Sequence, residues 1–196
     1  MKKIVYVLAL SLLVTSIGYA QDYKKFKVGL GLGYAAASGN GAGGGVIVTV
    51  EPAYRLQDNL SIGLRLESAL ITRGYSESFT GASLDVAGIG SYTLNGQYYF
   101  GTTDFRPFAG LGLGLYSLAE VKVDASSSGG PSSATAAAAE SKFGFYPRVG
   151  FDYHHFSMSA DYNIVPPTKP AGGTGEFKNN YFGIRFGWFF GGGKTK

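Results

Sequence analysis

The 196-residue chain contains no cysteine and only two histidines. The absence of cysteine excludes disulfide bonds, thiolate metal sites and the lipid anchor of a lipoprotein, which is attached through that residue. No stretch reaches the roughly 18 consecutive apolar residues that identify a membrane-spanning helix. The formal net charge is only +4, and the charged residues are scattered along the chain. This distribution argues against nucleic acid as a partner.

The N-terminal segment has the layout of a secretory signal. Two lysines follow the first methionine, an apolar run extends over 4–14, and small residues lead to Ala20. The apolar run is too short to cross a bilayer as a helix, which needs roughly 20 residues. The alternative interpretation is a buried N-terminal helix. The pattern favours a cleaved signal peptide over 1–20, with Gln21 as the first mature residue.

Glycine and aromatic residues are abundant in the chain. The sequence holds 31 glycines, 14 phenylalanines and 14 tyrosines, and it has neither a collagen period nor the composition of a disordered tail. This combination favours a β architecture. No change in composition marks a second domain, so residues 21–196 are predicted to form a single domain.

Large apolar residues alternate with smaller or polar ones along eight segments. The pattern is clearest near the C-terminus, where Phe182, Ile184, Phe186 and Trp188 share one parity and Arg185 has the other. Successive side chains of a strand point to opposite faces, so a period of two predicts β-strands. The eight predicted strands are 26–36, 46–56, 60–73, 91–100, 107–117, 142–154, 156–164 and 178–190.

The connections between these segments alternate in length. Short ones are expected at 57–59, 101–105 and 154–155, and longer ones at 37–45, 74–83, 124–141 and 165–178. Outer-membrane barrels combine an even number of strands with short periplasmic turns and longer extracellular loops. The pattern therefore predicts an eight-stranded antiparallel up-and-down β-barrel with both termini in the periplasm.

Alternation alone does not say whether the apolar face looks inward, as in a soluble lipocalin-like barrel, or outward to lipid. The second face is rich in glycine and carries tyrosine and phenylalanine, unlike a face turned to water. An eight-stranded barrel is just wide enough for side chains to fill, and glycine opposite arginine or tyrosine makes that packing possible. Aromatic residues also gather near the strand ends, as in the girdles of membrane barrels. We therefore predict an all-β transmembrane β-barrel.

The predicted inward face collects charged residues of both signs. Five cations and four anions nearly cancel, and pairing is expected because an unpaired charge away from bulk water is costly. One interpretation is a selectivity lining for a pore, and the other is a salt-bridge plug without a continuous water path, which the width of an eight-stranded barrel favours. The predicted lumen charge network consists of Glu51, Arg55, Arg65, Glu67, Arg73, Arg148, Asp152, Asp161 and Arg185.

Two features could be mistaken for catalytic or cofactor sites. His155 could act as a base toward Ser157, but it lies on a predicted turn with no acid to orient it. The adjacent His154 would point to the opposite face, so the two histidines are not expected to chelate one metal. The glycine runs at 29–33 and 110–114 have a strict period of two with no following helix, unlike a dinucleotide-binding loop. No catalytic, cofactor or metal site is therefore predicted.

The chain resembles the small outer-membrane β-barrel family that includes OmpX-, OmpW- and OmpA-barrel-like proteins. The resemblance covers the mature chain and rests most specifically on SYTLNGQYYF at 91–100 and RPFAGLGLG at 106–114. It implies a structural protein, an adhesin, a narrow channel or, rarely, a lipid-modifying enzyme. Many such barrels end on an aromatic residue that the assembly machinery reads, whereas here Phe190 is followed by the tail 191–196. Either an internal signal is used or a short tail is tolerated.

These observations favour a non-enzymatic integral outer-membrane protein with a largely plugged polar lumen and surface loops for structural or interaction roles. The alternatives are a narrow passive porin-like channel for small solutes, an outer-leaflet lipid enzyme and a soluble periplasmic binder. The expected partners are outer-membrane lipid and lipopolysaccharide, the outer-membrane assembly machinery and an extracellular partner bound through the loops. We expect no cofactor and no nucleic acid, and we expect a monomer.

The signal-peptide interpretation predicts the N-terminus of the exported protein. N-terminal sequencing of the protein purified from the cell envelope should begin at Gln21, because Gly18 and Ala20 suit the two pockets that select the cleavage site. Recovery of a chain that still carries residues 1–20 would contradict this interpretation.

Overall fold

The computed structural model describes seven segments of the chain, which together hold only strands, turns and irregular structure. The described residues are 22–39, 42–72, 74–75, 86–123, 134–136, 140–168 and 176–194. The predicted signal peptide and Arg73 lie outside them. No helix within these ranges has both the length and the apolar character needed to cross a membrane.

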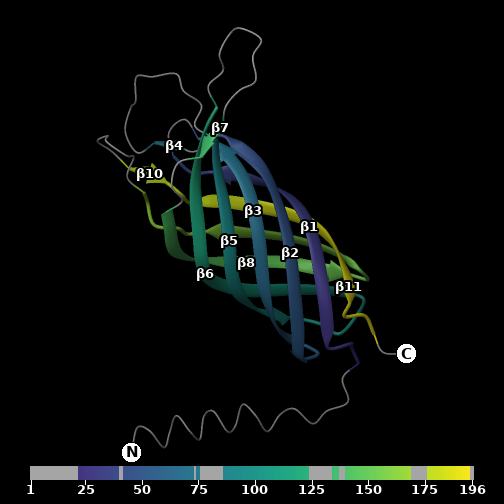
Figure 1. Cartoon of the computed structure of the whole chain (residues 1–196). Helices are drawn as coiled ribbons and strands as arrows, with labels where there is room; N and C mark the ends of the chain where they lie inside the picture. The colour runs from purple at the N-terminus through teal and green to yellow at the C-terminus, as the bar shows by residue number, and fades with distance from the viewer. Residues whose placement is uncertain are drawn as a thin grey trace, which may run out of the picture.

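Eight long strands form the body of the molecule, and three short strands lie near its loops (Figure 1). The long strands are β1 (Phe26–Ala37), β2 (Gly44–Gln57), β3 (Leu60–Thr72), β5 (Val86–Tyr99), β6 (Phe105–Val123), β8 (Glu140–Tyr153), β9 (Phe156–Asn163) and β11 (Tyr181–Gly191). The short strands are β4 (Gly74–Tyr75), β7 (Ala134–Ala136) and β10 (Phe177–Lys178). The eight predicted strands are thus confirmed.

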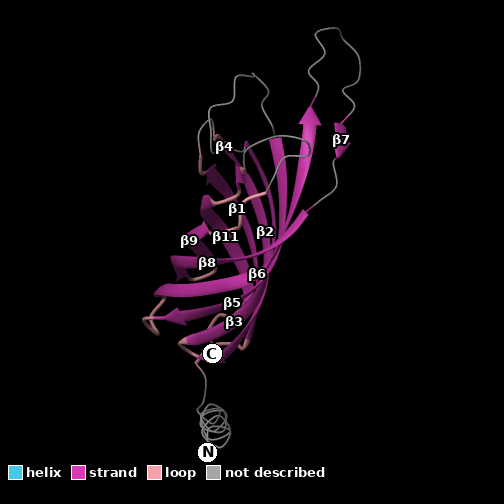
Figure 2. Ribbon diagram, turned by 90° about the vertical axis from the view of Figure 1, so that its left-hand side faces the viewer, coloured by secondary structure: helices cyan, strands magenta, loops and turns pink. Residues whose placement is uncertain are grey.

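The long strands close into an antiparallel barrel. Each pairs with its neighbours in the chain, and the ring is completed where β1 pairs with β11, with Leu30 opposite Trp188. Every long strand thus has a partner on both sides, as hydrocarbon demands of a β structure, although β8 meets β9 only over Arg148–Tyr153 and at one further bridge, Phe145–Ile164. At the loop end β7 pairs with the end of β6 (Figure 2), and β4 pairs with β10 (Figure 1). The opposite end, where the short connections lie, is called the turn end.

The strands alternate between apolar outward and buried inward side chains. Leu32, Tyr92 and Trp188 are 63%, 63% and 54% exposed, whereas Arg65 and Tyr146 are fully buried. This is the reverse of a soluble lipocalin-like barrel, in which the apolar face would be buried. The outward face therefore meets lipid, as the sequence predicts.

Two strands extend further toward the loop end than predicted. β5 begins at Val86 rather than at residue 91, and β6 continues to Val123 rather than ending at 117. In these extensions the inward positions include Ile89 and Leu118, which are both buried. Around these two residues, at 86–90 and 117–119, the side chains of both faces are apolar or small, so the alternation that marks a strand in the sequence is lost there.

Close packing at one glycine explains part of the glycine content. Gly112 lies opposite Tyr146 on β8, and a Cβ at this position would overlap the tyrosine ring. The ring is not free to move away, since the Arg65 guanidinium lies over it at 3.5 Å from the centroid. The glycine therefore makes room for an aromatic residue in the narrow lumen.

We predict that Gly112→Ala lowers the free energy of unfolding by about 1–3 kcal/mol, the usual effect of overpacking a filled interior. Gly96→Ala is the matched control, because a Cβ there meets nothing within 4 Å. Denaturant unfolding of the two variants in the same lipid vesicles, followed through the single tryptophan, makes the comparison. Equal stabilities would show that the Tyr146 ring does not constrain this position.

Candidate functional site

The interior of the barrel is the candidate site, and its buried side chains form three layers along the axis. A cationic and aromatic layer lies at the turn end, an ion-paired layer fills the middle, and an apolar layer lies at the loop end. Every predicted member of the lumen charge network except Arg73 is buried inside, and Arg73 lies outside the described residues.

Lys27 and Asp152 form the buried ion pair nearest the turn end among the described residues. The two side chains are 2.9 Å apart, and the Lys27 ammonium also donates to the Tyr99 hydroxyl at 2.8 Å. The Tyr99 hydroxyl lies within hydrogen-bond distance of both Asp152 and Gln97, at 3.0 Å from each. Lys27 is absent from the predicted network, although its parity with Gly29 and Gly31 already places it on the inward face.

Glu51 and Arg148 meet across the lumen from β2 and β8. One guanidinium nitrogen of Arg148 contacts both carboxylate oxygens of Glu51, at 2.8 and 2.7 Å. Gln97 donates to the same carboxylate at 2.8 Å. This pair is buried at both members, so it links opposite walls of the barrel without access to bulk water.

Two arginines and two carboxylates form a four-membered cluster deeper in the barrel. Arg185 contacts both Glu67 and Asp161, and Arg65 lies 3.2 Å from Asp161. Asn163 accepts a hydrogen bond from Arg65 at 2.8 Å and donates to Asp161 at 2.6 Å. Hydrogen bonds from neighbouring groups are what allow such buried charges to remain in place.

Tyrosine hydroxyls complete this cluster on its loop side. Tyr181 donates to Glu67 at 2.5 Å, and Tyr116 donates to Asn163 at 2.8 Å. Both rings are fully buried. The alternation along the strands predicts tyrosines on the inward face, but it does not identify the partner of each hydroxyl. That partner depends on the stagger between strands that are distant in the sequence.

Two inward arginines at the turn end are bonded to backbone oxygens rather than to carboxylates. Arg55 donates to the Gly192 carbonyl at 2.9 Å, and Arg106 donates to the carbonyls of Gly101, at 3.2 Å, and Asp58. Arg106 is not in the predicted network, because it precedes the predicted strand 107–117 by one residue. With Lys27 and Arg106 included, six inward cations face four carboxylates among the described residues. The described lumen therefore holds two more cations than carboxylates, and this surplus lies at the turn end.

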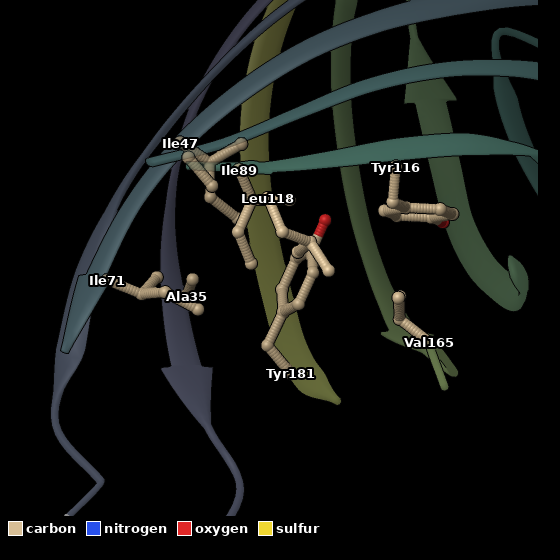
Figure 3. Packing of buried hydrophobic residues seen from close by; sticks show 9 residues of the cluster. Ala35, Ile47, Ile71, Ile89, Tyr116, Leu118, Val165 and Tyr181 are labelled. Carbon is tan, nitrogen blue, oxygen red and sulfur yellow. The ribbon is translucent and has the colours of Figure 1, made fainter. Parts of the chain in front are cut away.

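The loop end of the lumen is apolar, which the sequence analysis did not predict. Side chains from five neighbouring strands, β1, β2, β3, β5 and β6, lie there with Tyr181 (Figure 3). Such a constriction offers no partner to water or to an ion, and hydrophobic constrictions close pores by dewetting. The buried members of this layer are Ala35, Ile47, Ala69, Ile71, Ile89, Tyr116, Leu118, Val165 and Tyr181.

A small cavity remains between the ion pairs. It measures about 40 Å³ and is lined in part by Lys27, Glu51, Gln97, Arg148 and Arg185. At roughly 10–15 Å³ for each water, this space suits about three molecules. It is too small for a nutrient-sized solute.

The histidines do not form a catalytic arrangement. His155 Nδ1 lies 2.8 Å from the Phe189 carbonyl, and its ring stacks on Trp188. His154 is on the exposed β8–β9 turn, with a positive φ of 53° and a distance of 3.9 Å to Asp104. Within the described ranges, no group of three or more potential ligands is arranged to hold a metal.

Residues 6–190 match the family described as "Outer membrane protein beta-barrel domain". The chain belongs to this family. Its place is therefore the outer membrane of Gram-negative bacteria, with the apolar exterior of the barrel in contact with lipid. No protein with a curated description matches it in sequence.

Solved structures show the same fold at low sequence identity. Neisserial surface protein A is 19% identical, with 84% of this chain and 94% of that chain covered and a TM-score of 0.55. The outer membrane protein OprG from Pseudomonas aeruginosa is 14% identical, with 87% and 98% covered and a TM-score of 0.52. At these identities the likeness concerns the barrel architecture alone.

We predict that Asp161→Ala lowers the free energy of unfolding by about 3–5 kcal/mol, because it leaves two buried arginines without a shared carboxylate. Glu140→Ala serves as control, since Glu140 pairs with Lys142 at 2.5 Å but both side chains are partly exposed. Its effect should stay below about 1 kcal/mol. Denaturant unfolding in lipid vesicles measures both, and equal losses would argue against a specific role of the buried cluster.

Proposed function

We propose that this outer-membrane barrel is non-enzymatic, that its lumen is closed, and that it acts through the loops at the cell surface. The observation that carries the proposal is the apolar layer at the loop end, stacked directly on an ion-paired middle layer. An ion or polar solute would have to break buried charge pairs and then cross a region with few polar partners. Both steps are costly.

The narrow passive channel is the second candidate. It is supported by the inward glycines and by the small polar cavity beside the Glu51–Arg148 pair. A path through the barrel would nevertheless require Tyr181 and the isoleucines around it to move apart, and these side chains are fully or almost fully buried. A lipid enzyme has less support, because both histidines lie at the turn end, away from the surface loops.

The orientation and partners of the barrel are also part of this proposal. Short turns and both termini face the periplasm, and the longer connections face outward, as is usual for such barrels. The protein is a monomer that contacts lipopolysaccharide at the loop end and is inserted by the outer-membrane assembly machinery. Residues 1–20 are removed on export.

Two of the surface connections are joined to each other, which supports a defined binding surface. The short strand β4 follows β3, the short strand β10 precedes β11, and the two pair in antiparallel fashion above the barrel (Figure 1). Their pairing brings the β3–β5 and β9–β11 connections together. A partner that binds here would contact both connections at once.

Trimming these connections tests the surface role. We predict that cells displaying the full chain bind to surfaces coated with extracellular matrix, and that cells carrying the protein without residues 76–84 and 169–175 do not, while the barrel still folds. Heat-modified migration on gels checks folding, and a protein with Lys24→Ala, an exposed position at the turn end, serves as control. Unchanged adherence after loop trimming would count against the proposed role.

A swelling assay on liposomes that contain the purified full chain tests the channel alternative. Liposomes that contain the folded protein should swell no faster than empty liposomes in amino acids or small sugars, because the lumen has no continuous path. Swelling comparable to that with a general porin would favour the channel.

A further inference from the structure

The two ends of the described chain meet across the turn-end mouth of the barrel. The Lys24 amide donates to the Gly193 carbonyl at 2.8 Å, and Tyr23 forms an antiparallel bridge with Lys194. Gly191 and Gly192 have φ values of 73° and 63°, a left-handed conformation that glycine adopts without strain and that turns the chain away from β11. We call residues 22–25 and 192–194 together the terminal strap.

Tyr23 is the buried side chain of this strap. It is only 5% exposed, although Asp22, Lys24 and Lys25 beside it are exposed. Its hydroxyl lies 2.9 Å from the Thr102 carbonyl and 3.1 Å from that of Thr103, in the β5–β6 turn. One side chain therefore ties the strap to a turn from the other side of the mouth.

The backbone of the strap is held to a second turn and to β2. Asp58, in the β2–β3 turn, accepts hydrogen bonds from the amides of Asp22 and Tyr23 at 3.1 and 3.2 Å. The Arg55 amide donates to the Lys25 carbonyl at 2.7 Å. These contacts position Tyr23 over the opening rather than beside it.

The Tyr23 ring covers the two arginines that bond backbone carbonyls. The guanidinium carbons of Arg55 and Arg106 lie 4.8 and 4.0 Å from its centroid. On the lumen side, the Tyr99 ring lies 5.8 and 4.2 Å from the same two groups. The arginines are thus held between two aromatic rings, and such cation–π contacts strengthen when water is excluded.

We propose that the terminal strap is a lid that seals the turn-end mouth, and that Tyr23 is its closing residue. The lid goes beyond the closed lumen proposed above, because it concerns the outermost closure and not the ion-paired or apolar layers. The strap is short and is held by a few hydrogen bonds, one ring and the exposed Lys194–Asp104 ion pair at 3.2 Å, so it can open locally while the barrel ladder stays intact. Opening would expose Arg55 and Arg106 to water.

The absence of cysteine makes the lid directly testable, because a single engineered thiol reports its own exposure. Ser61 and Ser91 are 2% and 1% exposed, and neither hydroxyl has a hydrogen-bond partner among the described residues. Ser61 lies opposite Arg55, just behind the strap, whereas Ser91 lies opposite Glu67 in the middle layer. Ser61→Cys reports on the lid, and Ser91→Cys reports on the deeper lumen.

The experiment follows the reaction of each thiol with a water-soluble maleimide in the full chain folded in lipid nanodiscs. In the Ser61→Cys protein, Tyr23→Ala should accelerate labelling by about tenfold or more, since both the ring and its hydrogen bonds are lost. Tyr23→Phe keeps the ring and should give an intermediate rate. Lys24→Ala should change nothing, because that side chain is exposed and the backbone hydrogen bond remains.

In the Ser91→Cys protein, labelling should stay slow with or without Tyr23. Equal rates for the Ser61→Cys protein with tyrosine or alanine at position 23 would overturn the lid, and so would equal acceleration at both reporters, which indicates general unfolding. Rapid labelling of the Ser91→Cys protein with Tyr23 present would instead contradict the closed lumen. The failure of the lid and the failure of the proposed function are therefore distinguishable.

Discussion

The width of an eight-stranded barrel is the constraint on which the rest of this structure depends. The lumen is just wide enough for inward side chains to fill it, so each large residue needs a small one opposite and each charge needs a partner within reach. Gly112 beneath the Tyr146 ring meets the first requirement, and Arg148 against Glu51 meets the second. The interior is consequently a packed polar core that changes to an apolar one at the loop end.

The sequence predicted the fold well because the lipid-facing side chains differ so clearly from the inward ones. Where that contrast fails, prediction fails too: the residues around Ile89 and Leu118 continue two strands with apolar side chains on the inward face. Parity placed Arg65 and Asp161 inside but not their contacts, since these depend on the stagger between strands far apart in the chain. The inward position of Arg106 was not predicted, because this residue lies one position before a predicted strand. The proposed capping role of Tyr23 leaves no signal in the alternation of apolar and polar residues.

Closure in this molecule is distributed along the barrel axis rather than concentrated at one gate. Aromatic rings cover unpaired cations at the turn end, buried ion pairs join opposite walls in the middle, and isoleucine and leucine side chains exclude water near the loops. Each layer uses a different interaction, so a substitution that weakens one leaves the others in place. In the proposed function, this packed barrel supports the connections that β4 and β10 bring together.

Single-channel recording tests the closed lumen most directly. The mature chain is refolded into a planar bilayer, and circular dichroism of the same preparation establishes that it is a β structure. The account predicts quiet membranes, without discrete current steps, in the presence of folded protein. Reproducible conductance steps of uniform size would contradict it and would identify the ion-paired middle layer as the lining of an open pore.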